Sequence, residues 1–91
     1  MASLRRIESA AMAGVEDELK ARIAQIDRDM RLLSVGELRR RADAIAEVAR
    51  ANGMEPLGRL AADLGDTLQR SGRGAGVRSC LDGMRAAMAG R

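Results

Sequence analysis

The sequence predicts an all-α fold, an up-and-down antiparallel four-helix bundle. Apolar residues recur at steps of three and four along most of the chain, which is the period of an amphipathic helix. Short links that contain Ser, Asn, Gly or Pro separate these stretches, and no stretch alternates as a strand does. Short links between helices favour antiparallel neighbours, so we expect each helix to pack beside the one that follows it.

The first predicted helix covers residues 2–33. Its apolar stripe consists of Leu4, Ile7, Ala11, Val15, Leu19, Ile23, Ile26, Met30 and Leu33. Gly14 interrupts the stripe, and a glycine inside a helix costs about 1 kcal/mol relative to alanine. We expect a break or bend near Ala13 and Gly14, and we divide the chain into an N-terminal helix or extension (1–14) and a bundle (15–91). Whether residues 1–14 form an extra helix or the start of one kinked helix stays open.

Three further helices follow, at about Val35–Ala51, Pro56–Arg70 and Gly76–Ala89. Ser34 and Glu37 have the spacing of a capping box, which predicts the start of the second helix. Asn52-Gly53 supplies residues that tolerate the left-handed conformation at a helix end, and Pro56 suits the first turn of the third helix. Gly58 and Gly65 lie a heptad apart, so we expect another backbone to approach the third helix closely there.

Composition excludes several kinds of site. The 91 residues suffice for one small domain and include no histidine, no aromatic residue and a single cysteine, Cys80. A histidine base, a histidine-containing metal site, an internal disulfide and a cysteine-cluster metal site are therefore excluded. We expect no catalytic residue, no cofactor and no enzymatic activity. No secretory signal or membrane span is evident, so we expect a cytoplasmic protein.

The arginines do not predict a nucleic-acid interface. The candidates for phosphate contacts are Arg39, Arg40, Arg41, Arg50, Arg70, Arg73 and Arg78. Net charge is only +3, the two signs are interspersed, and no aromatic residue is present to stack on bases. We therefore expect a salt-bridged, solvated surface. The glycine-rich residues 72–79 lack the Gly-Lys-Ser/Thr ending and the preceding strand of a phosphate loop, so we expect a flexible linker.

Sulfur-containing residues fit a structural role. Cys80 falls on the apolar stripe of the fourth helix, where we expect a buried thiol. Most of the six methionines lie at stripe positions and are expected to fill the core. Met54, in the turn between the second and third helices, and Met12, beside the first stripe, are the two candidates for exposed residues available to a partner.

A charged ridge on the second helix is the most informative surface feature. Arg39, Asp43, Glu47 and Arg50 follow one another at steps of four, four and three. Arg39–Asp43 and Glu47–Arg50 are in ion-pair register, and each pair contributes about 0.2–0.5 kcal/mol. The ridge is either a solvated face or a docking surface for another protein.

One long run has the layout of a known family: ELRRRADAIAEVARANGMEPLGRLAADLGDTLQRSGRGAGVRSCLDGMRAAM. The matching structural residues are Ala42, Ile45, Gly53, Leu57, Leu60, Ala61 and Leu64. On these residues the chain resembles, from about Val15 to Met88, a histidine-containing phosphotransfer (HPt) domain. By this resemblance, Asp43 stands where the family has its phosphoacceptor histidine, Ala46 where it has a lysine, and Glu47 where it has a glycine. The resemblance implies an HPt-like bundle that cannot relay phosphate.

We therefore predict a non-catalytic, pseudo-phosphotransfer adaptor in bacterial two-component signalling. It would bind a receiver domain or a histidine kinase through Arg39, Asp43, Ala46, Glu47 and Arg50. The alternative is a self-assembling helical module, a homodimer in which the stripe from Leu4 to Leu33 pairs with its copy. A third alternative is a nucleic-acid-binding regulator.

Overall fold

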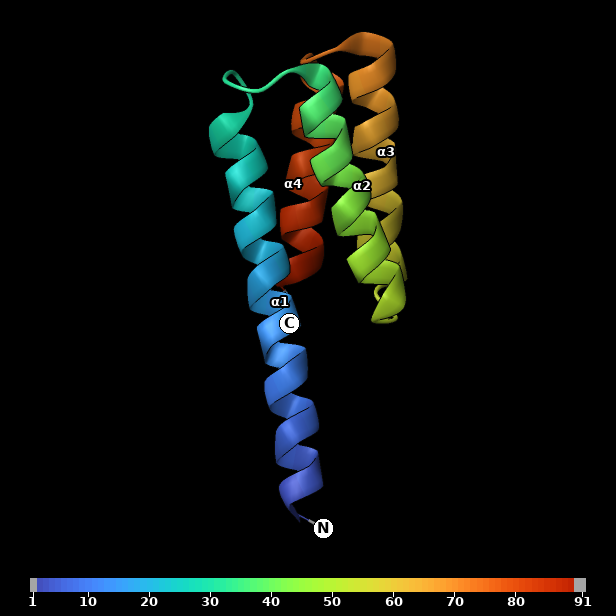
Figure 1. Cartoon of the computed structure of the whole chain (residues 1–91). Coiled ribbons are helices and arrows are strands. Elements are labelled where there is room, and N and C mark those ends of the chain that lie inside the picture. Colours follow the sequence, from blue (N-terminus) through green and yellow to red (C-terminus); the bar gives the residue numbers. More distant parts are fainter. Residues whose placement is uncertain (1, 90–91) are drawn as a thin grey trace.

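Four helices run alternately up and down to form the bundle (Figure 1). The computed structural model describes the backbone of residues 2–89 and the side chains of residues 14–89. Its helices are α1 (Ala2–Asp29), α2 (Val35–Ala51), α3 (Glu55–Ser71) and α4 (Ala75–Ala89), and residues 2–89 contain no strand. Both α1 and α3 pack against α2 and α4, so α1 and α3 lie diagonally opposite each other. The predicted all-α antiparallel four-helix bundle is confirmed.

The first helix is uninterrupted, and it ends at Asp29, four residues before the end that the apolar stripe suggested. α1 is one continuous helix of 28 residues, and the break expected near Ala13 and Gly14 is wrong. A single glycine costs about 1 kcal/mol, which is too little to end a helix that lacks a proline or a capping residue at that point. Leu4, Ile7 and Met12 lie outside the residues whose side chains are described, so the division at residue 14 stays a prediction.

The core lies between the four helices and is made of aliphatic side chains and methionines. Among residues 14–89 no polar or charged side chain is buried. The largest fully buried side chains are Leu19, Ile23, Ile26, Leu38, Ile45, Met54, Leu57, Leu64, Leu68, Leu81, Met84 and Met88. Cys80 is only half-buried at the edge of this core, rather than fully buried as predicted. Leucine, isoleucine and methionine thus replace the absent aromatic residues, as the composition indicated.

The start of α2 follows the predicted cap in part. The hydroxyl of Ser34 accepts a hydrogen bond from the backbone N–H of Glu37 at 3.1 Å, as a helix-capping serine does. The Glu37 carboxylate is 3.5 Å from the guanidinium groups of both Arg40 and Arg41. Glu37 therefore pairs with arginines on its own helix, where the capping box predicted a bond back to Ser34.

The turn between α2 and α3 explains why Met54 is buried. The N–H of Met54 bonds to the carbonyl of Ala49 at 2.8 Å, and the N–H of Gly53 bonds to the carbonyl of Arg50 at 3.2 Å. Gly53 has a φ of 71°, which completes a Schellman motif after the cap residue Asn52. This motif turns the next side chain back onto the helix, and Met54 is only 1% exposed. The prediction that Met54 is available to a partner is wrong.

The glycine-rich link between α3 and α4 fastens the end of α1. α3 runs to Ser71 and α4 begins at Ala75, so the link is shorter than the predicted linker. Arg73, at its centre, donates from Nε to the carbonyl oxygen of Met30 at 2.8 Å and from Nη2 to the carbonyl oxygen of Leu33. Arg73 thereby satisfies backbone acceptors in the segment that follows α1, where the helix itself provides no donors.

Candidate functional site

The predicted docking ridge lies beside the seam between α2 and α3. Arg39 and Asp43 are 44% and 59% exposed, and Nε of Arg39 is 3.9 Å from Oδ2 of Asp43. Glu47 and Arg50 are also exposed. The second predicted ion pair, between Glu47 and Arg50, is not formed. Four of the five predicted docking side chains therefore reach solvent, with Asp43 near the middle of α2.

Ala46 is the exception, and its placement corrects the prediction. It is only 4% exposed and belongs to the core cluster. A methyl group built on Gly58 of α3 would lie 3.8 Å from the carbonyl oxygen of Ala46, which shows how closely the two helices approach there. Ala46 therefore contributes to helix packing, and it offers almost no surface to a partner.

Two glycines of α3 lie directly beneath the charged ridge. A methyl group on Gly65 would lie 3.0 Å from Oδ1 of Asp43 and 3.7 Å from Cγ of Arg39. A methyl group on Gly58 would lie 3.1 Å from Cγ of Arg50. Both glycines are buried, so the predicted close approach of another helix is confirmed. The side chains of Arg39, Asp43 and Arg50 rest across α3 because these two positions carry no side chain.

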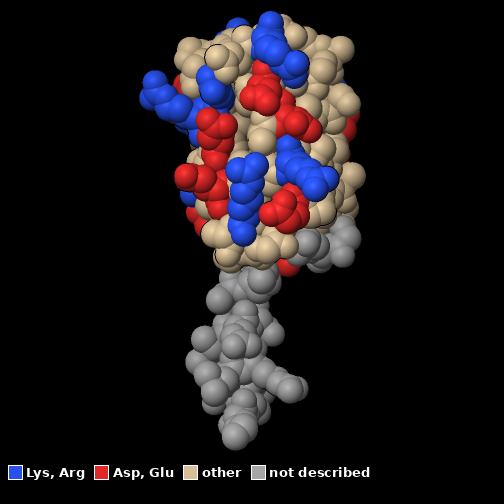
Figure 2. Space-filling view, turned by 90° about the vertical axis from the view of Figure 1, so that its right-hand side faces the viewer, with Lys and Arg blue, Asp and Glu red and all other residues tan. Residues whose placement is uncertain are grey.

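Figure 2 shows that basic and acidic side chains alternate over the face formed by α2 and α3. The charged side chains that reach solvent include Arg39, Asp43, Glu47 and Arg50 on α2, and Arg59, Asp63, Asp66 and Arg70 on α3. Acidic residues thus lie between arginines along both helices. Of these α3 residues, only Arg70 was singled out from the sequence. No continuous basic field covers this face.

Most of the arginines singled out from the sequence have partners within the protein. Arg40 and Arg41 approach Glu37, and Arg70 donates from Nε to the Asp66 carbonyl at 3.4 Å. Arg73 holds the segment after α1, as described above, and Arg78 bonds to α1. The predicted salt bridges are therefore formed by Arg40, Arg41 and Arg78, while Arg70 and Arg73 bond to backbone carbonyls.

A charged contact between α1 and α4 was not predicted. Asp27 of α1 lies 3.0 Å from Nη2 of Arg78 through Oδ1 and accepts a hydrogen bond from Arg85 through Oδ2. Burial raises the pKa of the Asp27 carboxyl, but hydrogen bonds from Arg85 and Arg78, with their charges, outweigh burial and hold the pKa below its usual value. Sequence spacing gave no signal for this contact, because the residues meet only when the bundle closes.

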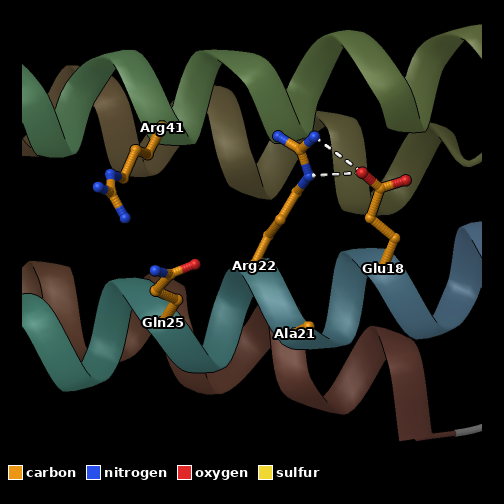
Figure 3. A pocket seen from close by; sticks show the side chains of 5 residues that line it. All are labelled: Glu18, Ala21, Arg22, Gln25 and Arg41. Carbon is orange, nitrogen blue, oxygen red and sulfur yellow. Dashed lines mark hydrogen bonds and ion pairs between the residues drawn. The ribbon is translucent and has the colours of Figure 1, made fainter.

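A hollow lies between α1 and α2 (Figure 3). It has a volume of about 430 Å³ and is lined by Glu18, Ala21, Arg22, Gln25 and Arg41. Arg22 donates from Nε and Nη2 to Oε1 of Glu18, at 3.3 and 2.9 Å. None of the four α1 residues was predicted to belong to a site, although their spacing places them on one face of the helix.

Within the described part of the chain, no group of three metal-binding side chains comes together. No helix in that part is long and apolar enough to span a membrane. No protein-family model, curated protein or solved structure matches the chain.

Proposed function

We propose that this chain is a non-catalytic, HPt-like adaptor that binds a receiver domain or a histidine kinase of bacterial two-component signalling in the cytoplasm. The observation that supports this proposal is the position of Asp43. Its exposed carboxylate stands near the middle of α2 over Gly65 of α3, in a four-helix bundle. A partner can therefore reach Asp43 across a low seam, with Arg39 and Arg50 on either side along α2.

The proposed adaptor does not relay phosphate. A phosphohistidine needs a histidine, and the chain has none. Asp43 has Glu47 one turn further along the exposed side of the same helix, and a second negative charge there disfavours a phosphoryl group on Asp43. Binding, without group transfer, is the activity that this surface can provide.

The test is calorimetric titration of the full chain with receiver domains and histidine kinases encoded near its gene. Asp43→Arg and Glu47→Arg each reverse a charge on the ridge, and Asp82→Arg makes the same reversal at an exposed position on α4. We expect the two ridge variants to lose at least tenfold in affinity and Asp82→Arg to bind as the unmodified chain does. If no such protein binds, or if both ridge variants bind unchanged, the proposal fails.

A second experiment tests whether phosphate is transferred to the chain. We expect no label to pass to the chain when it is mixed with a receiver domain phosphorylated with ³²P. The unlabelled chain still binds this receiver in the calorimeter. Acid-stable or acid-labile label on the chain would contradict a purely binding role.

The alternative, self-assembly through α1, is favoured by the length of that helix. α1 has 28 residues and α4 has 15, which at 1.5 Å per residue gives roughly 42 Å against roughly 23 Å. Figure 1 shows α1 continuing past the other helices. In this alternative, the stripe that includes Ile7 pairs with a second copy. Light scattering over a concentration series decides: a homodimer that Ile7→Glu dissociates supports it, and a monomer at every concentration rejects it.

A further inference from the structure

Arginines gather at the end of the bundle that carries the α1–α2 link and the α3–α4 link. This end, which we call the basic end, comprises both links and about two turns of each helix beside them, residues 23–41 and 65–81. It carries eight arginines and four carboxylates, whereas the rest of residues 14–89 carries five basic and eight acidic side chains. Arg73 of one link donates to carbonyl oxygens of the other, so the two links form one surface (Figure 1). Charges that alternate along the chain are therefore partly separated in space.

Three exposed arginines of the basic end have no carboxylate partner among the described residues. The side chain of Arg31 makes no hydrogen bond or ion pair there. Arg70 and Arg73 donate to backbone carbonyl oxygens, which are neutral acceptors. Asp29 and Glu37 each already lie within 4.0 Å of two other arginines. The surplus of positive charge at this end is therefore exposed and is not neutralised within the bundle.

An exposed leucine lies in the same surface. Leu32 is 79% exposed, and it is the only large apolar side chain that is exposed among residues 14–89. Its N–H bonds to the Asp29 carbonyl at 2.9 Å, and Arg73 holds the nearby carbonyls of Met30 and Leu33. The backbone that carries Leu32 is thus fastened on both sides, and the apolar side chain stands in solvent beside the unpaired Arg31.

This combination favours an anionic lipid surface over a nucleic acid. Clusters of Lys and Arg are attracted to the negative surface of the cytoplasmic leaflet, and an apolar side chain gains free energy when it leaves water for the boundary of the acyl chains. The phosphates of a nucleic acid would also attract the arginines, but they provide no apolar environment for Leu32. The more acidic rest of the bundle is repelled by an anionic surface, so the basic end is the part that faces it.

We infer that the basic end binds reversibly to an anionic membrane surface, with Leu32 inserted between the headgroups. Arg31 contacts lipid phosphates directly, whereas Arg70 and Arg73 add their charge while their N–H groups hold backbone carbonyls. The long part of α1 extends from the opposite end of the bundle, so it does not stand between the basic end and the membrane (Figure 1). Leu32 and Arg31 lie outside the docking ridge, and the test needs no receiver domain or kinase.

The experiment is sedimentation of the full chain with vesicles made of equal parts of phosphatidylcholine and phosphatidylglycerol, beside vesicles of phosphatidylcholine alone. We expect the anionic vesicles to bind at least tenfold more tightly, and added salt to weaken this binding. Equal binding to the two kinds of vesicle, or no binding, would overturn the inference. A DNA duplex that releases the chain from anionic vesicles at an equal concentration of phosphate would overturn lipid as the occupant.

A matched pair of variants tests the position of the charge. Arg31→Gln and Arg59→Gln each remove one positive charge from an exposed position, the first in the basic end and the second on α3 outside it. We expect at least a threefold loss of affinity for anionic vesicles in Arg31→Gln and no loss in Arg59→Gln, with circular dichroism melting curves that show both remain folded. Equal losses would mean that the vesicles respond only to overall charge, and the inference would be lost.

The absence of aromatic residues allows a direct test of insertion. In Leu32→Trp the new side chain is the only tryptophan of the chain, so its fluorescence reports on this position alone. We expect its emission to shift to shorter wavelength when anionic vesicles are added, and the emission of Ala86→Trp, at an exposed position on α4, to stay in place. Unshifted emission from Leu32→Trp on vesicles that have bound the chain would overturn the insertion of Leu32.

Discussion

The seam between α2 and α3 and the attachment of α1 are built from different interactions. At the seam, Gly58, Gly65 and Ala46 let two helices approach closely, and charged side chains rest on the glycines. At α1, the last turns bury aliphatic residues such as Ile26, but contacts from other elements also fasten them. Those contacts come from the arginines of α4, from Arg73 and, for Asp29, from Arg41 of α2.

This difference indicates which part of the bundle is more stable. The α2–α3 seam joins neighbours in sequence through a short capped turn, so little chain entropy is lost when it closes. The polar contacts of α1 join residues far apart in the chain and are partly exposed, so water competes with them. We therefore expect the α2–α3 hairpin to be the last part to unfold and α1 to detach first, as local opening of the less protected element.

The largest effect is expected from breaking the packing that the hairpin provides. Leu64 of α3 is fully buried, and Leu64→Ala should lower the free energy of unfolding by about 2–5 kcal/mol, because it removes apolar contacts and leaves a cavity. Urea titration followed by circular dichroism measures the loss. Leu32→Ala is the control, since Leu32 is 79% exposed, and it should change stability by no more than about 0.5 kcal/mol.

The second-largest effect is expected from a substitution at Gly58, one of the two glycines of the α2–α3 seam. Gly58→Val adds atoms where a methyl group would already lie 3.1 Å from Cγ of Arg50 and 3.8 Å from the Ala46 carbonyl, so we expect a loss of about 1–3 kcal/mol from overpacking. At Gly36 a methyl group would come no closer than 4.0 Å to Ser34 Oγ, so Gly36→Val should be neutral or slightly stabilising. Equal losses in the two variants would mean that the close approach of α2 does not set the requirement for glycine at position 58.

The third effect concerns the charged contact that holds α1 to α4. Asp27→Asn removes the charge that Arg78 and Arg85 neutralise, and we expect a loss of about 1 kcal/mol at pH 7. Because the pKa of Asp27 is lowered by folding, its contribution is present above the unfolded pKa of about 4 and is lost as the pH falls through the lower folded pKa. Urea titrations of both proteins from pH 7 to pH 2.5 should show the difference shrinking below about pH 4.

The control for this prediction is Asp82→Asn on α4, where the carboxylate is exposed and has no ion pair with any residue whose side chain is described. We expect it to change stability very little at any pH in the series. A difference between unmodified chain and Asp27→Asn that stays constant down to pH 2.5 would contradict the lowered pKa.

The sequence predicted what depends on local pattern, and it missed what depends on closure of the bundle. The Ser34 cap, the Gly53 turn and the buried stripes follow from the spacing of neighbouring residues, so they were predictable. Met54 was misjudged because a position in a turn indicates exposure unless the turn type is known. Arg73, in a stretch predicted to be flexible, finds its acceptors in the segment that follows α1, and no pattern in the chain identifies such a partner.

Arg73 supplies the smallest predicted effect and the most local one. Arg73→Gln removes two hydrogen bonds to the carbonyl oxygens of Met30 and Leu33 in an exposed place, so we expect a loss of only about 0.5–1 kcal/mol. Hydrogen exchange measured by NMR should show the amides of Leu32 and Leu33, which bond to the Asp29 carbonyl, exchanging roughly two to five times faster.

The matched control is Arg70→Gln, because Arg70 bonds to a carbonyl of its own helix and not to the end of α1. We expect it to leave the exchange of Leu32 and Leu33 unchanged. Amides of α2 and α3 should keep their protection in Arg73→Gln, because α1 opens without them. If protection fell equally in all four helices, α1 and the hairpin would form one cooperative unit, and the contrast between the two regions would be wrong.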